Sequence, residues 1–128
     1  MIGSLSVVGL GPGDQNLITP EVSLAMLEAS DFIGYGPYLN RLHIQKNKIL
    51  HPSDNQKELE RAELGLELAQ LGKKVVIVSS GDPGVFAMAA AVMEAIDKGK
   101  KEWKKVEVSV LPGITAMLAA SAKLGAPL

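Results

Sequence analysis

Short runs of β-branched residues alternate with longer segments of helical periodicity along the whole chain. Strands are predicted where apolar residues run together or alternate, and helices where they recur every three or four positions. The predicted strands span residues 5–10, 31–35, 48–51, 75–79 and 106–110. This alternation of strands and helices is typical of an α/β fold with a parallel sheet.

The helices between these strands carry start signals of unequal quality. Thr19 is a good N-cap for the first helix because a proline follows it at the first helical position. Ser53 and Gln56 have the spacing of a capping box for the helix that ends near residue 72, and Asn55 with Glu58 is a competing choice. We expect one of these two pairs to begin that helix.

The later helices are strongly apolar. The segment from Val85 to Lys98 is apolar nearly all round, which predicts a buried helix. A last apolar helix follows Pro112 and ends near Gly125. The sequence contains no internal repeat or linker, so we expect one domain over residues 1–128.

Composition narrows the class of protein. The chain has 128 residues, 47% of them hydrophobic and 21% charged, with a formal net charge of −1 and no cysteine. This near-neutral balance gives no electrostatic reason to expect nucleic acid or a membrane surface as partner. The lack of cysteine excludes disulfides and thiolate metal sites and fits a cytoplasmic location. The first residues, Met1–Leu5, carry no basic leader, and we expect no membrane segment.

Two further features have ordinary explanations. The lysines around Trp103 could suggest nucleic-acid binding, but acidic residues interrupt them, and a solvated loop before a strand is the better interpretation. His43 and His51 are too few and too isolated to predict a metal site, so we expect none.

The candidate chemistry lies in three glycine-rich loops, at residues 9–14, 80–84 and 112–116. Each follows a predicted strand, and ligands of open parallel sheets bind beyond the carboxyl ends of the strands. We therefore expect the loops to meet at one edge of the sheet. The first loop has aspartate at position 14 instead of the third glycine of a dinucleotide motif, and Pro12 removes a backbone donor, so phosphate binding is disfavoured.

Each loop also has a purely structural interpretation. Asp82 before Pro83 could cap a helix, and Thr115 could cap the next one. Asp14 could cap a turn, and the tyrosines at 35 and 38 could be partly buried aromatics. Only the coincidence of three such loops on three strands favours a binding site.

Taken together, Gly9-Leu10-Gly11-Pro12-Gly13-Asp14, Gly81-Asp82-Pro83 and Pro112-Gly113-Ile114-Thr115-Ala116 resemble the motifs of the tetrapyrrole methylase family. The resemblance implies a five-stranded parallel sheet of order 3-2-4-1-5 flanked by helices. It also implies a second, C-terminal domain, absent from this chain, and S-adenosyl-L-methionine held as cofactor in the cleft between the two domains. A partly apolar cleft wall would favour self-association as a homodimer.

The resemblance also implies roles for individual residues. The family's cofactor contacts fall on Pro12, Gly81, Asp82, Val85, Thr115 and Ala116. Asp14, Tyr35 and Tyr38 would lie nearer the tetrapyrrole, with Asp14 the candidate for a catalytic role, although no catalytic base is identified.

A narrower resemblance comes from Tyr35-Gly36-Pro37-Tyr38. It is similar to the branch of the family that methylates C-17 of precorrin-3B or cobalt-precorrin-3 and contracts the ring, in cobalamin biosynthesis. Two alternatives stay open. One is another methyltransferase of the same fold, acting on a different corrin position, ribosomal RNA or a protein, and the other is a nucleotide- or effector-binding module without catalysis.

Overall fold

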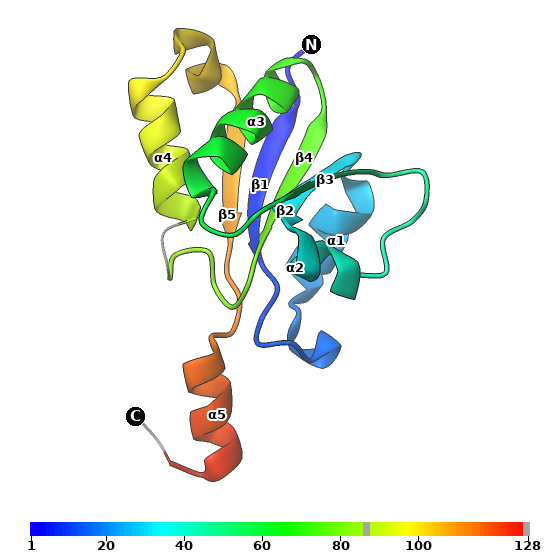
Figure 1. Cartoon of the computed structure of the whole chain (residues 1–128), viewed down its shortest axis with the longest axis vertical. Coiled ribbons are helices and arrows are strands. Elements are labelled where there is room, and N and C mark those ends of the chain that lie inside the picture. Colours follow the sequence, from blue (N-terminus) through cyan, green and yellow to red (C-terminus); the bar gives the residue numbers. More distant parts are fainter. Residues whose placement is uncertain (86–87, 127–128) are drawn as a thin grey trace.

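The computed structural model describes residues 1–85 and 88–126 and contains a sheet of five parallel strands in the order β3-β2-β4-β1-β5 (Figure 1). The predicted fold class and strand order are therefore confirmed. The strands are β1 (Ser4–Gly9), β2 (Asp31–Tyr35), β3 (Ile49–Ser53), β4 (Lys74–Ser79) and β5 (Glu107–Leu111).

The central strands are apolar on both faces, as a parallel sheet with helices on either side requires. Residues Val75 to Val78 of β4 are at most 2% exposed. In β1, Leu5, Val7 and Val8 are fully buried. Because β1 pairs with both β4 and β5, its carboxyl end lies between the loops that follow those strands.

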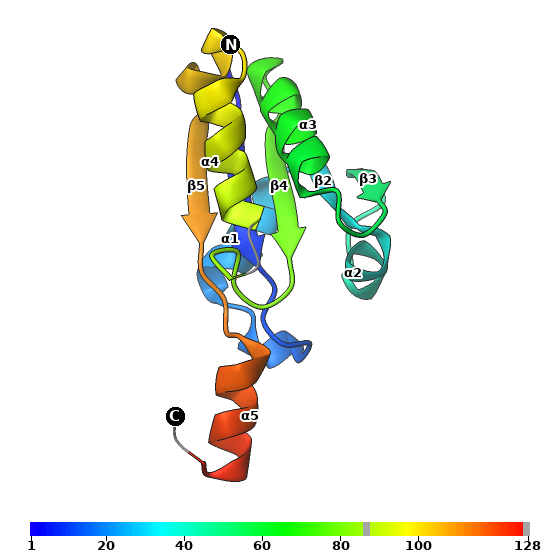
Figure 2. The ribbon, with the colours of Figure 1, turned by 60° about the vertical axis from the view of Figure 1, so that its left-hand side comes forward.

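Helices cover the two faces in pairs (Figures 1 and 2). On one face α3 and α4 bury Leu66 and Val92 against Leu5 and Ile77, and on the other α1 and α2 bury Val22 and Leu39. The helices are α1 (Pro20–Glu28), α2 (Gly36–Arg41), α3 (Glu58–Gln70), α4 (Met88–Lys98) and α5 (Ala116–Leu124), with short 3-10 helices η1 (Gln15–Leu17) and η2 (Lys101–Lys105). None of the described helices has the length and hydrophobicity needed to span a bilayer.

The start of α3 differs from both capping predictions. Its N-cap is Lys57, which makes no side-chain capping bond. Ser53 instead lies in β3, where its hydroxyl accepts a hydrogen bond from Arg61 Nε at 2.6 Å. Asn55 accepts only from the neighbouring Gln56 amide. The predicted local caps fail because these polar side chains are used by the β3–α3 connection and not by the helix end.

Three other segments differ from the sequence predictions. Helix α4 buries one face, with Met88 and Val92 inside and Met93 exposed, so the prediction of a buried helix holds for that face only. The lysine-rich segment is the 3-10 helix η2, whose Trp103 is buried while its lysines are exposed. Helix α2 begins with Gly36-Pro37, a pair that locally predicts a turn.

Helix α5 stands apart from the sheet. It begins after Thr115, whose side chain accepts the Leu118 amide, and it ends at Gly125 in the left-handed conformation, as predicted. The helix has no buried residue, and it extends beyond the carboxyl ends of the strands in both views (Figures 1 and 2). Its apolar Met117 and Leu118 are 62% and 50% exposed.

A hydrogen bond between the buried Asp31 and the partly exposed His51 joins the start of β2 to the edge strand β3. The Asp31 side chain accepts from Ser30 at 2.7 Å and lies 2.8 Å from His51 Nε2. Burial raises the pKa of the Asp31 carboxyl, but the His51 and Ser30 hydrogen bonds outweigh burial and hold this pKa below its usual value.

We expect Asp31→Ala to cost about 1–3 kcal/mol of unfolding free energy at pH 7, because His51 and Ser30 lose a buried partner. A carboxyl with a lowered folded-state pKa stabilises above its unfolded pKa and loses that contribution as pH falls through the folded value. The difference between wild type and variant, measured by urea unfolding, should therefore shrink below about pH 4. A difference that stays constant down to pH 2 would contradict this account.

Candidate functional site

The three glycine-rich loops meet at one edge of the sheet, as predicted. Gly11 and Gly81 pair through their backbones, with N–H···O distances of 3.1 and 2.9 Å. The Gly113 amide donates to Asp82 Oδ1 at 3.0 Å. Backbone pairing thus joins the loop at residues 9–14 to the loop at residues 80–84. The side chain of Asp82 joins this second loop to the third, at residues 112–116.

Glycine is required at positions 9 and 113, because other backbone segments approach closely there. A Cβ built on Gly9 would overlap Gly81 O and lie 2.9 Å from Gly113 N. A Cβ built on Gly113 would overlap the same Gly81 oxygen. The contacting atoms are backbone and cannot rotate away, so only glycine fits at these two positions.

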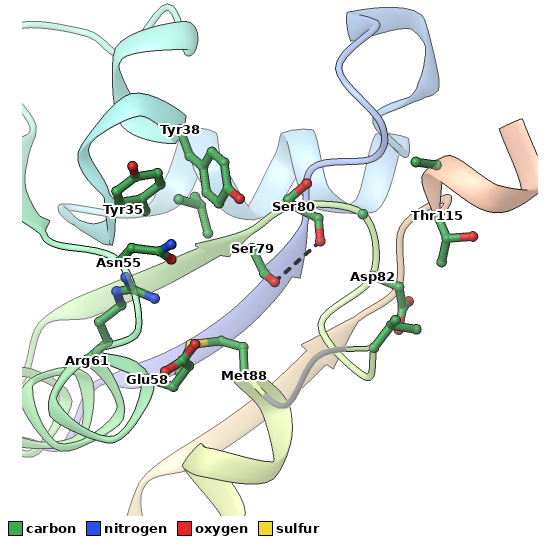
Figure 3. A pocket seen from close by; sticks show the side chains of 14 residues that line it. Tyr35, Tyr38, Asn55, Glu58, Arg61, Ser79, Ser80, Asp82, Met88 and Thr115 are labelled. Carbon is green, nitrogen blue, oxygen red and sulfur yellow. Dashed lines mark hydrogen bonds between the residues drawn. The ribbon is translucent and has the colours of Figure 1, made fainter. Parts of the chain in front are cut away.

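A cavity of about 360 Å³ opens beside this junction, a volume within the range of small-molecule sites (Figure 3). It brings together residues from three loops, two strands and four helices, far apart in sequence. Of the predicted site residues, seven line it: Tyr35, Tyr38, Gly81, Asp82, Val85, Thr115 and Ala116.

Two predicted site residues lie elsewhere. Pro12 lines a separate cavity of about 60 Å³, which shares Tyr38 and Ser80 with the larger one. Asp14 lines neither cavity, is exposed, and accepts the Asn16 amide at 2.8 Å as the N-cap of η1. The structure therefore gives Asp14 the structural role of a turn cap.

The tyrosines form one wall of the cavity. Tyr35 ends β2, and Tyr38 follows in the first turn of α2. Their rings meet edge to face, with centroids 5.2 Å apart and an interplanar angle of 87°. Arg41 lies 5.9 Å from the Tyr38 centroid on the side of the smaller cavity. The two rings thus present a fixed aromatic surface to whatever occupies the cavity.

The opposite wall consists of backbone and small side chains. Asp82 uses both carboxylate oxygens, with Oδ2 accepting the Gly84 amide at 2.8 Å and Oδ1 accepting the Gly113 amide. Its side chain therefore shapes the loop as well as adding negative charge. Thr115 accepts a hydrogen bond as the α5 cap, which leaves its hydroxyl proton available to a ligand. Gly81, at φ +61°, adds no side chain to this wall.

The residues that α3 and the loop before it bring to the cavity were not predicted from the sequence. Asn55, Glu58 and Arg61 line the side next to the tyrosines (Figure 3). Arg61 could have been found from the sequence, because it is the first residue of the buried stripe of α3 that continues through Gly65 and Ala69. Helical periodicity predicts a buried residue at this position, and an arginine there indicates an unusual role.

Comparisons with known proteins agree with this geometry. The family model "Tetrapyrrole (Corrin/Porphyrin) Methylases" matches residues 4–128. A "Precorrin-3B C(17)-methyltransferase" of Sinorhizobium sp is 56% identical over 128 residues, which is all of this chain and 50% of that protein. A "Probable cobalt-factor III C(17)-methyltransferase" of Salmonella typhimurium is 41% identical, covering 97% of this chain and 51% of that one.

A solved structure is also similar. The crystal structure of the methyltransferase CobJ superposes with a TM-score of 0.93 at 54% identity, covering 98% of this chain and 52% of that chain. The chain therefore spans about half the length of the relatives it matches.

Proposed function

Because the chain belongs to the tetrapyrrole methylase family, we propose that it forms the donor-binding half of a methyltransferase acting on C-17 of precorrin-3B or its cobalt-containing counterpart. The reaction would contract the macrocycle and belong to cobalamin biosynthesis. The observation that carries the proposal is the convergence of two family motif loops and the Tyr35–Tyr38 segment on one cavity. The names of the two C(17)-methyltransferase relatives support the choice of substrate.

The methyl donor of this family is S-adenosylmethionine, a substrate that the reaction consumes. It supplies a methyl group activated by positively charged sulfur. The glycine-loop end of the cavity fits such a ligand, since Gly81 leaves the backbone bare, Val85 offers an apolar surface and Thr115 a hydroxyl. A carboxylate at Asp82 suits a sulfonium and opposes a phosphate.

The residues of this chain would act by alignment. Gly81, Asp82, Val85, Thr115 and Ala116 would hold the donor, while Tyr35 and Tyr38 would hold the face of the macrocycle. Placing the two reactants in the productive orientation accounts for most of the catalysis that such a transfer needs. Pro12 would act indirectly, by shaping the loop that pairs with Gly81, and Asp14 would only cap its turn.

The remainder of the protein would supply the opposite side of the cleft. The apolar side chains exposed on α5 support this, because Met117, Leu118 and Leu124 form a surface that a second domain could cover. In the chain by itself, the same surface would favour association of two copies.

The donor assignment can be tested with Gly81→Ala. A Cβ at position 81 would enter the space beside Thr115 Cα, 3.6 Å away, so we expect affinity for S-adenosylhomocysteine to fall about tenfold or more. The measurement is a titration followed by amide NMR shifts, which detects weak binding. Wild type should bind S-adenosylhomocysteine and show no comparable shifts with ATP or NAD.

Gly125→Ala is the matched control. Gly125 also has a left-handed φ, +66°, but no atom of residues 1–85 or 88–126 lies within 4 Å of its Cβ position. Both variants should therefore lose about 1 kcal/mol of stability from backbone strain, and only Gly81→Ala should lose the ligand. Equal affinities in the two variants, or preference for ATP, would reject the donor site.

A further inference from the structure

Arg61 is a buried arginine without an acidic partner. It is 8% exposed, whereas arginines are almost never fully buried unless they are paired. Its Nε donates to Ser53 Oγ at 2.6 Å and its Nη2 to the Asp54 carbonyl at 2.5 Å. Among residues 1–85 and 88–126, no carboxylate forms an ion pair with it.

Two neutral oxygens leave most of the guanidinium unsatisfied. Its five N–H donors include those of Nη1, which makes no hydrogen bond within the described part of the chain. Nη1 is not among the side-chain atoms that are buried without a hydrogen-bond partner, so its N–H groups are open to the cavity, where an anion can accept from them. The arrangement therefore favours an anionic ligand.

The guanidinium lies at one end of the large cavity. Figure 3 shows Arg61 beside Asn55 and on the same side as Tyr35, across the cavity from Asp82 and Thr115. Glu58 lines the cavity as well, but none of the ion pairs in the described part of the chain joins it to Arg61. The unpaired positive charge is therefore separated from the glycine loops and adjoins the aromatic wall.

We propose that Arg61 binds a peripheral carboxylate of the tetrapyrrole and so fixes the rotation of the macrocycle relative to the methyl donor. The proposal rests on the proposed function, in which the substrate carries acetate and propionate side chains. A guanidinium fork matches a carboxylate with two parallel hydrogen bonds. Ser53 and Asp54 already hold Arg61 in place, so little side-chain freedom is lost on binding.

The chain is suited to a direct spectroscopic test, because Arg41 and Arg61 are its only arginines. Their Nε–H signals are assigned in ¹⁵N-labelled protein by comparison with Arg61→Lys. Uroporphyrin III, a polycarboxylate tetrapyrrole, and S-adenosylhomocysteine are then titrated separately. We expect uroporphyrin III to shift the Arg61 signal and S-adenosylhomocysteine to leave it in place.

Variants give the second readout. Arg61→Gln should weaken uroporphyrin III binding about tenfold or more and leave S-adenosylhomocysteine binding unchanged, while Arg61→Lys should retain an intermediate affinity. Lys57→Gln is the control, since it removes one positive charge from an exposed residue beside the same helix, outside the cavity. It should behave as wild type.

The remaining outcomes overturn the proposal. Unchanged uroporphyrin III affinity in Arg61→Gln would give Arg61 a purely structural role, and a loss confined to S-adenosylhomocysteine would place the donor's own carboxylate there. If Arg61→Gln does not fold, the wild-type titration decides, and an Arg61 signal unmoved by uroporphyrin III rejects the proposal. Failure of the proposed function looks different, because wild type and Lys57→Gln would then both fail to bind S-adenosylhomocysteine.

Discussion

Gly113→Ala is expected to destabilise the chain by about 3 kcal/mol and to abolish ligand binding at the loop junction. The new Cβ would overlap Gly81 O and lie 3.0 Å from both Cα and C of Gly9. These are backbone atoms of two other loops, so the strain can be relieved only by separating the loops. Separation would also break the hydrogen bond from the Gly113 amide to Asp82.

Gly36→Ala is the control for this experiment. Its Cβ would meet only Pro52 Cβ, at 3.9 Å, and alanine is favourable inside α2. Unfolding in urea, followed by circular dichroism, should leave Gly36→Ala at or slightly above wild-type stability. A Gly113→Ala protein within about 0.5 kcal/mol of wild type would show that the loops are not packed as described.

The sheet was predictable because its signal is local. Continuous apolar runs such as Val75–Val78 have few uses other than a strand covered on both faces, and the order of strands followed from the resemblance. Helix α5 was also predictable, since Thr115 and Gly125 act as caps within their own segment. In these elements the local preference and the tertiary packing agree.

Prediction failed where distant residues decide the local structure. Ser53 has good capping chemistry, but Arg61 takes its hydroxyl, and α3 begins without a side-chain cap. The same tertiary contact positions Arg61, so the end of the cavity that Arg61 lines could not be predicted from local sequence. The glycine loops could be found as motifs, whereas the approach of Arg61 to Tyr35 depends on how α3 packs against the sheet.

Methyl transfer is expected only when this chain is joined to a second half. The cavity is lined at one end by the tyrosines and at the other by two of the glycine loops, but it is open, and a drug-sized ligand normally has most of its surface buried. Transfer also depends on alignment, and a displacement of about 1 Å can cost a hundredfold in rate. The exposed apolar surface of α5 would remain uncovered in the isolated chain.

The decisive protein is a fusion of this chain to the part of the Sinorhizobium methyltransferase that it does not match. The half of that protein that this chain matches is 56% identical to it over 128 residues. Controls are this chain alone, the other part alone, and the fusion carrying Gly81→Ala. Circular dichroism and gel filtration establish that each protein is folded before activity is compared.

The measurement is mass spectrometry of the product after incubation with S-adenosylmethionine and precorrin-3B or cobalt-precorrin-3. The fusion should yield a product that has gained one methyl group. Gly81→Ala in the fusion should lower the rate at least about tenfold, and either half alone should yield no methylated product. Turnover by the isolated chain comparable to that of the fusion would show that the residues of this chain suffice for methyl transfer. A folded fusion that binds S-adenosylhomocysteine but methylates neither substrate would contradict the proposed function.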